Sequence, residues 1–465
     1  MEIYTLKIKF LTPVFIGSGY ELDALSYVVR RENGKNYLFF LDIERWLQKN
    51  ITDSNIQDAL KRFDYLLLRK LIAKAEDTSN FCLYKIEISS SRFNSIYSEI
   101  LAGKREEHQL IVNLFPRSKT DFSPYLPASS VKGSIRTAIG NYVYPFVEKE
   151  AEALCAKKRN KRDRCYREYN KLIFGEPKFD VFKYLKISDC ILPKDSTFIV
   201  EPQEIYKGKK SPTPKNFAEA TKSLSFGEKL EVKTKCVIGD FKDLEWKKKH
   251  VKREIKNFGL EWLIEKINDF YISRYKNELK FYDTPNLISI KNSMKNLFDQ
   301  IKKEIDKNKN TALLRIGHFS HIECITWDNR KPKVKKYGTT RTLANGIYPF
   351  GWVLISFEQG YKHEHESEKR KLLAEDSTVS DTKRIEEQHQ ELSEVERICK
   401  RLIDKKEEHY SMEIYWKLDS FSLEDKKQIA RALKECWQAI GKWGKKVSRK
   451  QKEKIRKIKD ILGEK

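Results

Sequence analysis

The alternation of apolar and polar residues predicts a chain that mixes strands with helices. Residues 2–11 alternate between the two kinds, which is typical of a strand with one buried face. Residues 27–31 and 35–41 repeat this pattern on either side of Asn33-Gly34, the dipeptide that favours a two-residue hairpin turn. Further strands are expected at residues 81–88, 109–115, 185–191, 230–238, 313–316 and 352–357.

Helical periodicity appears between these strands and again near the end of the chain. Apolar residues recur every three or four positions over 56–72, 260–271 and 287–305, which predicts three amphipathic helices. Ser422 precedes another such pattern, and Ser448 with Gln451 forms a capping box before a last one. The final 55 residues therefore predict a helical hairpin.

The order of these elements predicts an α+β protein. A strand, a hairpin, helices, another strand and a helix fit an antiparallel sheet with helices on one face, as in ferredoxin-like and RRM-like folds. We expect such a core with helical insertions and a C-terminal helical extension. Shifts in composition place its parts at 1–202 (an N-terminal ferredoxin-like domain), 203–360 (a second α+β region), 361–410 (a charged linker) and 411–465 (the helical hairpin).

One stretch, YLPASSVKGSIRTAI at residues 125–139, combines a helix start with cationic side chains. Pro127 interrupts regular structure, and Ser129 and Ser130 offer side-chain oxygens that can cap a helix beginning near Val131. The apolar positions that follow fit a helix docked on a sheet.

The same helix start carries two cations and a glycine. Lys132 and Arg136 are four residues apart and share a helical face, while Gly133 has no side chain to keep another molecule away. Free amides, hydroxyls and cations together favour an anion, and a phosphodiester backbone is the anion we expect. The alternative is an ordinary amphipathic helix whose basic face is only solvated.

The overall charge also favours a polyanionic partner. The chain carries 92 Lys and Arg against 67 Asp and Glu, a formal net charge of +25. Such an excess is typical of proteins that bind nucleic acid. No run approaches the roughly 18 apolar residues of a membrane span, so we expect a cytoplasmic protein without a membrane partner.

Two further segments are candidates for contact with a nucleic-acid backbone. Gly17, Ser18 and Gly19 follow the first predicted strand, and a glycine loop there can bring backbone amides against phosphate. The turn-rich segment 331–351 is cationic, with Lys335, Lys336 and Arg341 among its basic residues, and lies between two predicted strands.

No cofactor or metal site is expected. The eight cysteines contain no C-x-x-C pair that could begin a zinc site. His318, His321 and Cys324 are spaced at i, i+3 and i+6, but they follow a strand and a glycine, where that spacing does not gather side chains as a helix would.

Several of these stretches resemble the RAMP superfamily of CRISPR effector subunits. TPVFIGSG at 12–19 resembles the family's N-terminal motif, and SSVKGSIR within 125–139 resembles its most characteristic block. LRIG at 314–317 and RTLANGIYPFGW at 341–352 resemble C-terminal blocks of the subunit that caps the type III-A Csm complex. Phe350 replaces the usual leucine, and no motif is matched after residue 361.

The resemblance implies a non-enzymatic scaffold that binds the 3′ portion of a CRISPR RNA (crRNA) in antiviral defence. It implies backbone and small Csm subunits as partners, and a part in crRNA maturation that recruits host nucleases. Carried over by motif, the expected RNA contacts are Ser129, Ser130, Lys132, Gly133, Arg136, Gly17, Ser18, Gly19, Arg315 and Arg341.

Three alternatives stay open at this stage. An endoribonuclease would need a general base or acid, which His318 or His321 could supply, or an aspartate after the first strand, where Asp23 lies. A RAMP subunit of a type III-B complex would share the lysine-glycine helix. A general RNA chaperone or ribosomal factor would explain the charge but not the order of the motifs.

Overall fold

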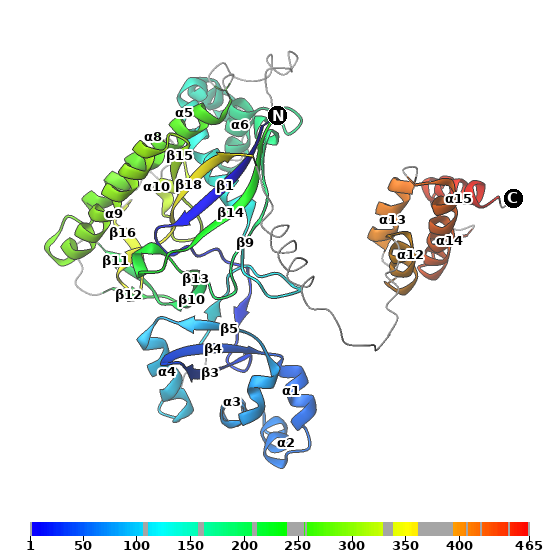
Figure 1. Ribbon diagram of the computed structural model, residues 1–465, viewed down its shortest axis with the longest axis horizontal. Coiled ribbons are helices and arrows are strands. Elements are labelled where there is room, and N and C mark those ends of the chain that lie inside the picture. Colours follow the sequence, from blue (N-terminus) through cyan, green and yellow to red (C-terminus); the bar gives the residue numbers. More distant parts are fainter. Residues whose placement is uncertain are drawn as a thin grey trace, which may run out of the picture. The chain divides into compact units, whose positions relative to one another are not determined.

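The protein is described by a computed structural model (Figure 1), in which the chain divides into two compact units, one within Met1–Glu364 and one within His365–Lys465. The residues described are 2–105, 110–156, 162–206, 212–239, 255, 258–328, 338–360, 394–405, 408–418, 421–444 and 447–463. The expected domain boundaries within the first unit stay predictions.

A five-stranded antiparallel sheet organises the first unit. Its strand order is β15-β18-β1-β14-β8, so segments from the beginning, middle and end of this unit lie side by side. The strands are β1 (Glu2–Phe10), β8 (Leu185–Ile187), β14 (Glu231–Ile238), β15 (Thr311–Arg315) and β18 (Trp352–Gln359). In β1, Leu6 and Ile8 are buried while Lys7 and Lys9 form ion pairs at the other face, which confirms the predicted half-buried strand.

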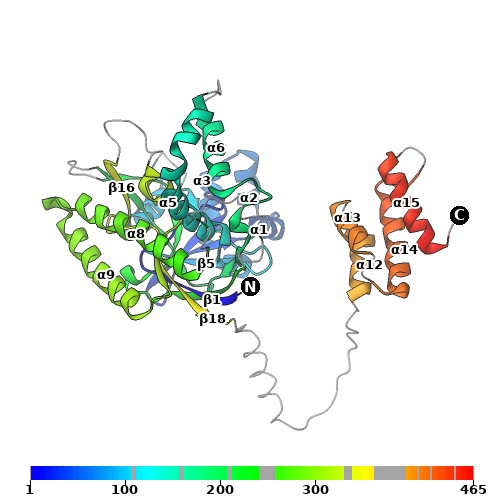
Figure 2. The ribbon, with the colours of Figure 1, turned by 90° about the horizontal axis from the view of Figure 1, so that it is seen from above.

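Three long helices pack on the apolar side of this sheet. They are α5 (Ala128–Ala156), α8 (Leu260–Phe281) and α9 (Ile288–Lys307), and they share one hydrophobic core with β1, β15 and β18. Figures 1 and 2 show α8 and α9 running next to each other beside the sheet. Two shorter helices also lie in this part, α6 (Arg162–Phe174) and α10 (Ile322–Ile325).

A seven-stranded mixed sheet forms the other half of the unit, in the order β2-β6-β13-β10-β5-β4-β3. Its strands are β2 (Glu21–Leu22), β3 (Tyr27–Glu32), β4 (Lys35–Leu41), β5 (Cys82–Ile88), β6 (Val112–Asn113), β10 (Thr197–Val200) and β13 (Phe217–Thr221). Its helices are α1 (Ile43–Asn50), α2 (Ser54–Lys61), α3 (Tyr65–Lys74) and α4 (Ser91–Leu101). Two small sheets pair β7 (Tyr125–Leu126) with β9 (Cys190–Ile191), and β12 (Thr213–Pro214) with β11 (Pro202–Tyr206), β16 (Thr340–Ala344) and β17 (Tyr348–Pro349).

The hairpin prediction is confirmed, and one helix prediction is wrong. Strands β3 and β4 pair around Asn33-Gly34, where both residues have positive φ, as a tight hairpin turn requires. The single helix expected over 56–72 is two helices. Phe63 adopts a positive φ, and the Asp64 carboxylate accepts a hydrogen bond from the Leu67 amide to start α3.

In the second unit, the residues that the structure describes form four helices with their own core. These are α12 (Glu394–Lys405), α13 (Glu408–Lys417), α14 (Leu423–Ala439) and α15 (Arg449–Leu462). Leu402, Leu418, Leu433 and Ile458 are among the buried residues. Ser422 and Ser448 cap α14 and α15 as expected, each accepting a backbone N–H three residues on. Among the described helices of the whole chain, none is long and apolar enough to cross a bilayer.

The predicted α+β class is confirmed by this combination of sheets and packed helices. The ferredoxin-like strand arrangement within it stays a prediction.

Candidate nucleic-acid interface

Helix α5 begins at Ala128, earlier than the sequence suggested. The expected capping role of Ser129 and Ser130 is therefore wrong, because both lie inside the first turn. Asp189, which follows β8, takes that role: its carboxylate accepts the Ala128 N–H at 2.7 Å. A negative charge at this position suits the positive end of the helix dipole.

The motifs that are distant in sequence meet around the start of α5. The Ser134 hydroxyl donates to the Arg315 carbonyl at the end of β15, at 3.0 Å. The loop after β1 joins the same region, since the His318 N–H donates to the Phe15 carbonyl at 2.7 Å and the Gly351 N–H to the Pro13 carbonyl at 2.8 Å. The structure thus brings the N-terminal glycine loop, the lysine-glycine helix and the LRIG turn together.

Gly317 allows the closest of these approaches. It has a φ of +85°, and a Cβ there would lie 2.4 Å from the Phe15 carbonyl oxygen. No other residue type fits without moving one of the two loops.

The N-terminal glycine loop itself is open to solvent. Gly17 and Gly19 are exposed, and the backbone N–H of the half-buried Ser18 donates to the Leu114 carbonyl at 3.0 Å. Tyr20 follows with 69% of its surface exposed, which sequence reasoning did not single out. An exposed ring beside exposed glycines is a suitable platform for a base.

Two residues at the start of α5, Lys132 and Gly133, are not explained by packing within the protein. Lys132 is half-buried, with no ion pair to any residue that the structure describes. Burial lowers the pKa of its ammonium group, and the nearby Asp180 opposes this change. Gly133 is exposed, and a Cβ there would meet nothing within 4 Å. Glycine costs a helix about 1 kcal/mol relative to alanine.

Arg136 has a different role from the one expected. Its guanidinium donates twice to the Asp180 carboxylate, at 2.8 and 3.0 Å, and lies 3.7 Å from the centroid of the Phe174 ring. The expectation that it is a free phosphate ligand is therefore corrected, since its charge is already neutralised by Asp180. It forms one wall of the site instead.

That wall belongs to a cavity of about 530 Å³ with an excess of positive charge. Besides Arg136 and Asp180, its lining includes four further cationic side chains: Lys132, Arg167, Lys171 and Lys183. One carboxylate cannot balance this set, although Lys171 also has Glu176 at 3.6 Å. The cavity is therefore electrostatically suited to phosphate groups.

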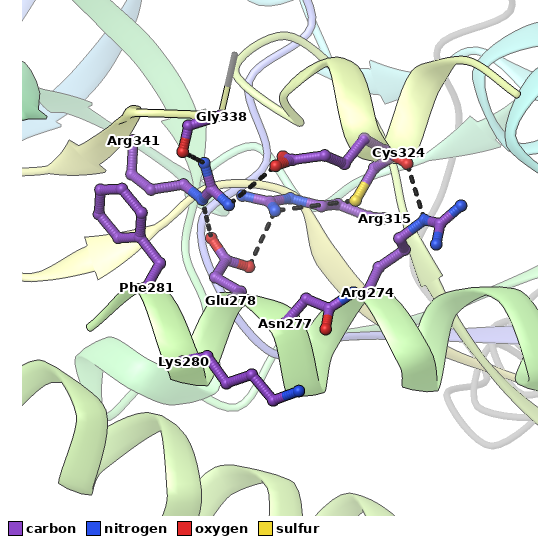
Figure 3. Close-up of a pocket in the computed structure, with 10 residues that line it drawn as sticks. Arg274, Asn277, Glu278, Lys280, Phe281, Arg315, Cys324, Gly338 and Arg341 are labelled. Carbon is purple, nitrogen blue, oxygen red and sulfur yellow. Dashed lines mark hydrogen bonds and ion pairs between the residues drawn. The ribbon is translucent and has the colours of Figure 1, made fainter. Parts of the chain in front are cut away.

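Arg315 and Arg341 do not belong to this surface. Both are buried, with exposures of 2% and 4%, so the expectation that they contact RNA is wrong for this structure. Both lie near the carboxylate of Glu278, which comes from α8 (Figure 3). Lys335 and Lys336 lie outside the described residues, and their part in binding stays a prediction.

Glu278 of α8 forms hydrogen bonds and an ion pair with residues of the two C-terminal motifs, LRIG and RTLANGIYPFGW. Its carboxylate accepts from Arg315 Nη1 and from the Trp352 indole N–H, both at 2.8 Å, and from the Tyr282 hydroxyl at 3.0 Å. Arg341 Nε lies 3.7 Å away. The arginines of these motifs are thus structural, and they hold β15, β16 and β18 in place behind the interface.

The side chains considered for catalysis or metal binding have structural partners. The His321 Nε2 atom accepts the Thr342 N–H at 3.2 Å, and the Asp23 carboxylate accepts the Leu25 and Ser26 amides of its own turn. His318 packs edge-on against Phe15. Among the residues described here, no three His, Cys, Asp or Glu side chains gather as a metal site would need.

His321 should make stability depend on pH. Burial, and then the charges of Arg315 and Arg341, hold its pKa well below the usual value. Below about pH 6.5, His321 binds a proton in the unfolded chain but not in the folded one. The free energy of unfolding therefore falls by up to about 1.4 kcal/mol for each unit by which the pH is lowered. His321→Asn, which keeps an acceptor, should reduce this slope in urea titrations between pH 7.5 and 5.5. An unchanged slope would assign the pH dependence to other groups.

A glycine loop, a lysine-glycine helix start and an LRIG turn thus meet on one α+β unit, beside a cavity with an excess of positive charge. The family model of the RAMP superfamily matches residues 7–449, so the chain belongs to the RAMP superfamily, as the motifs indicated.

The chain is also similar to an individual archaeal protein. The chain is 30% identical over 241 residues to a Methanocaldococcus jannaschii protein described as "CRISPR system Cms protein Csm5". That match covers 49% of this chain, and the chain spans about half (52%) of the relative's length.

Solved structures share the fold. A chain of a Csm–crRNA–target RNA ternary complex from a type III-A CRISPR-Cas system aligns with a TM-score of 0.52 at 20% identity, covering 76% of this chain and 100% of that one. The crystal structure of T. onnurineus Csm5 aligns with a TM-score of 0.50 at 18% identity, covering 75% and 99%.

Proposed function

We propose that this protein is a non-catalytic, crRNA-binding subunit of a type III-A CRISPR (Csm) complex. Membership of the RAMP superfamily and similarity to an archaeal Csm5 support this assignment. In this proposal the chain caps the 3′ end of the crRNA, contacts neighbouring Csm subunits and contributes to crRNA maturation. Recruitment of host nucleases belongs to the same proposal.

The observation that carries the proposal is the start of α5. Lys132 faces a cavity lined by three other cationic side chains besides the ion-paired Arg136, and Gly133 next to it leaves its helix turn uncovered. Within the described structure, the Lys132 ammonium group has no ion-pair partner, and no neighbouring atom requires a glycine at position 133. Both suit a sugar-phosphate backbone that lies against the first turn, with the ammonium group bound to a phosphate.

The absence of catalysis in this proposal is supported by how the candidate groups are used. His321 accepts a backbone amide and is held neutral, and Asp23 stabilises a turn, so neither is positioned as a general base. Incubating the protein with precursor and target RNA, with and without divalent metal, tests this part. Cleavage that is lost in His318→Ala, His321→Ala or Asp23→Ala would overturn it.

Lys132→Gln should weaken crRNA binding with little dependence on RNA sequence. Loss of one phosphate contact reduces the slope of log affinity against log salt by about 0.7 for a single strand. Fluorescence anisotropy at several salt concentrations measures this slope. The matched control is Lys61→Gln, which removes the same charge from an exposed position on α2. Equal slopes for the two variants would exclude Lys132 from the interface.

A further inference from the structure

The charge of the second unit is concentrated in its later half. Residues 394–420, with α12 and α13, carry six Lys or Arg against seven Asp or Glu. Residues 421–465, with α14 and α15, carry fifteen against six. This asymmetry makes the helix pair at the end of the chain electrostatically better suited to a polyanion than the preceding pair.

An exposed tryptophan on α13 lies beside this basic half. Trp416 has 71% of its surface exposed, whereas Trp437, in the core of the same unit, has 1%. Lys454 of α15 places its Nζ atom 5.6 Å from the Trp416 ring centroid. Lys454 and Lys457 also lie over the neighbouring Tyr415 ring, at 5.8 and 5.6 Å.

The core of the unit does not require Trp416. The buried cluster formed by the four helices includes Tyr415, Leu418 and Trp437 but not Trp416. A large aromatic side chain left in solvent, with one lysine beside it and a second over the neighbouring tyrosine ring, has the composition of a single-stranded nucleic-acid platform, where bases stack on the ring and cations neutralise the backbone.

We propose that Trp416, Lys454 and Lys457, called here the α13–α15 surface, bind single-stranded RNA by stacking a base on the indole ring. This goes beyond the function proposed above, because it gives the chain a second RNA site in its second unit. The two lysines also lie beyond residue 449, where the match to the family model ends.

Substitution of the indole tests the stacking contact. Full-length protein is titrated with a labelled oligouridine, both as wild type and in the Gly133→Leu background that is designed to block the α5 site. In that background Trp416→Ala should weaken binding about tenfold, within the range of one stacked base, and Trp416→Phe should retain most of the affinity. Ile403→Ala is the matched control, because it shortens an exposed apolar side chain on α12.

Charge variants and cross-linking test the rest. The double substitution Lys454→Gln with Lys457→Gln should reduce the slope of log affinity against log salt by about 1.4. Lys454→Arg with Lys457→Arg keeps both charges and should keep the slope. Ultraviolet cross-linking followed by mass spectrometry should attach RNA to the peptide that contains Trp416. Circular dichroism confirms that each variant is folded.

The outcomes separate this proposal from the preceding one. If Trp416→Ala and the glutamine pair bind oligouridine as the unsubstituted chain does, the α13–α15 surface is not an RNA site and is left for a protein partner. If only the α5 variants bind normally, the function proposed for the first unit fails while the second site stands.

Discussion

Glu278→Ala should lower the free energy of unfolding of the first unit by about 3–5 kcal/mol, the cost of leaving a buried charge without its partner. Glu278 is 2% exposed and its carboxylate faces Arg315 and Arg341, which are 2% and 4% exposed. Without it, both guanidinium groups stay buried with reduced compensation, and the Trp352 indole N–H loses its acceptor. Urea unfolding followed by circular dichroism measures the change.

Two variants control this result. Glu278→Gln keeps an acceptor for Trp352 and removes only the charge, so its loss of stability should be smaller than that of the alanine variant. Glu304→Ala removes a glutamate whose ion pair with Lys9 is partly exposed, and it should cost less than about 1 kcal/mol. Equal costs for Glu278→Ala and Glu304→Ala would show that the buried network does not stabilise the fold.

Gly133→Leu should reduce RNA affinity at least tenfold, about 1.4 kcal/mol, without destabilising the protein. A Cβ at position 133 has no atom of the described chain within 4 Å, so the side chain begins in open space. In a helix, leucine is more stable than glycine by about 0.5–1 kcal/mol. It would nevertheless stand where we place the RNA backbone. Anisotropy and thermal unfolding on the same preparation separate the two effects.

Gly133→Ala is the graded control for this experiment. A single methyl group fills little of the open space, so alanine should gain stability and lose less affinity than leucine. Retained affinity in the leucine variant would remove the first turn of α5 from the interface.

Local patterns predicted the elements well because their causes are local. Alternation is enough to place β1 and β14, and Asn33-Gly34 alone specifies the turn between β3 and β4. The break between α2 and α3 was missed because no glycine or proline marks it. Asp64, which caps α3, was the available signal.

The sequence identified motifs that lie together in the structure, but not how their side chains are paired. The sequence identified α5 and the loops around it, and the structure brings them together. It could not show that Arg136 is neutralised by Asp180, or that Arg315 is paired with Glu278, 37 residues away, because those partners are fixed only by tertiary packing. The role of a basic residue in a motif is therefore ambiguous until its carboxylate neighbours are known.

The missing Cβ at Gly317 has a mechanical consequence. The His318 N–H donates a hydrogen bond to the Phe15 carbonyl, so the chain just before the loop of residues 17–19 is fixed to the LRIG turn beside the central sheet. A strand of RNA lying on that loop would be held at a set height above the sheet. In the proposed capping role, this loop would act as a fixed surface rather than as a clamp that opens and closes.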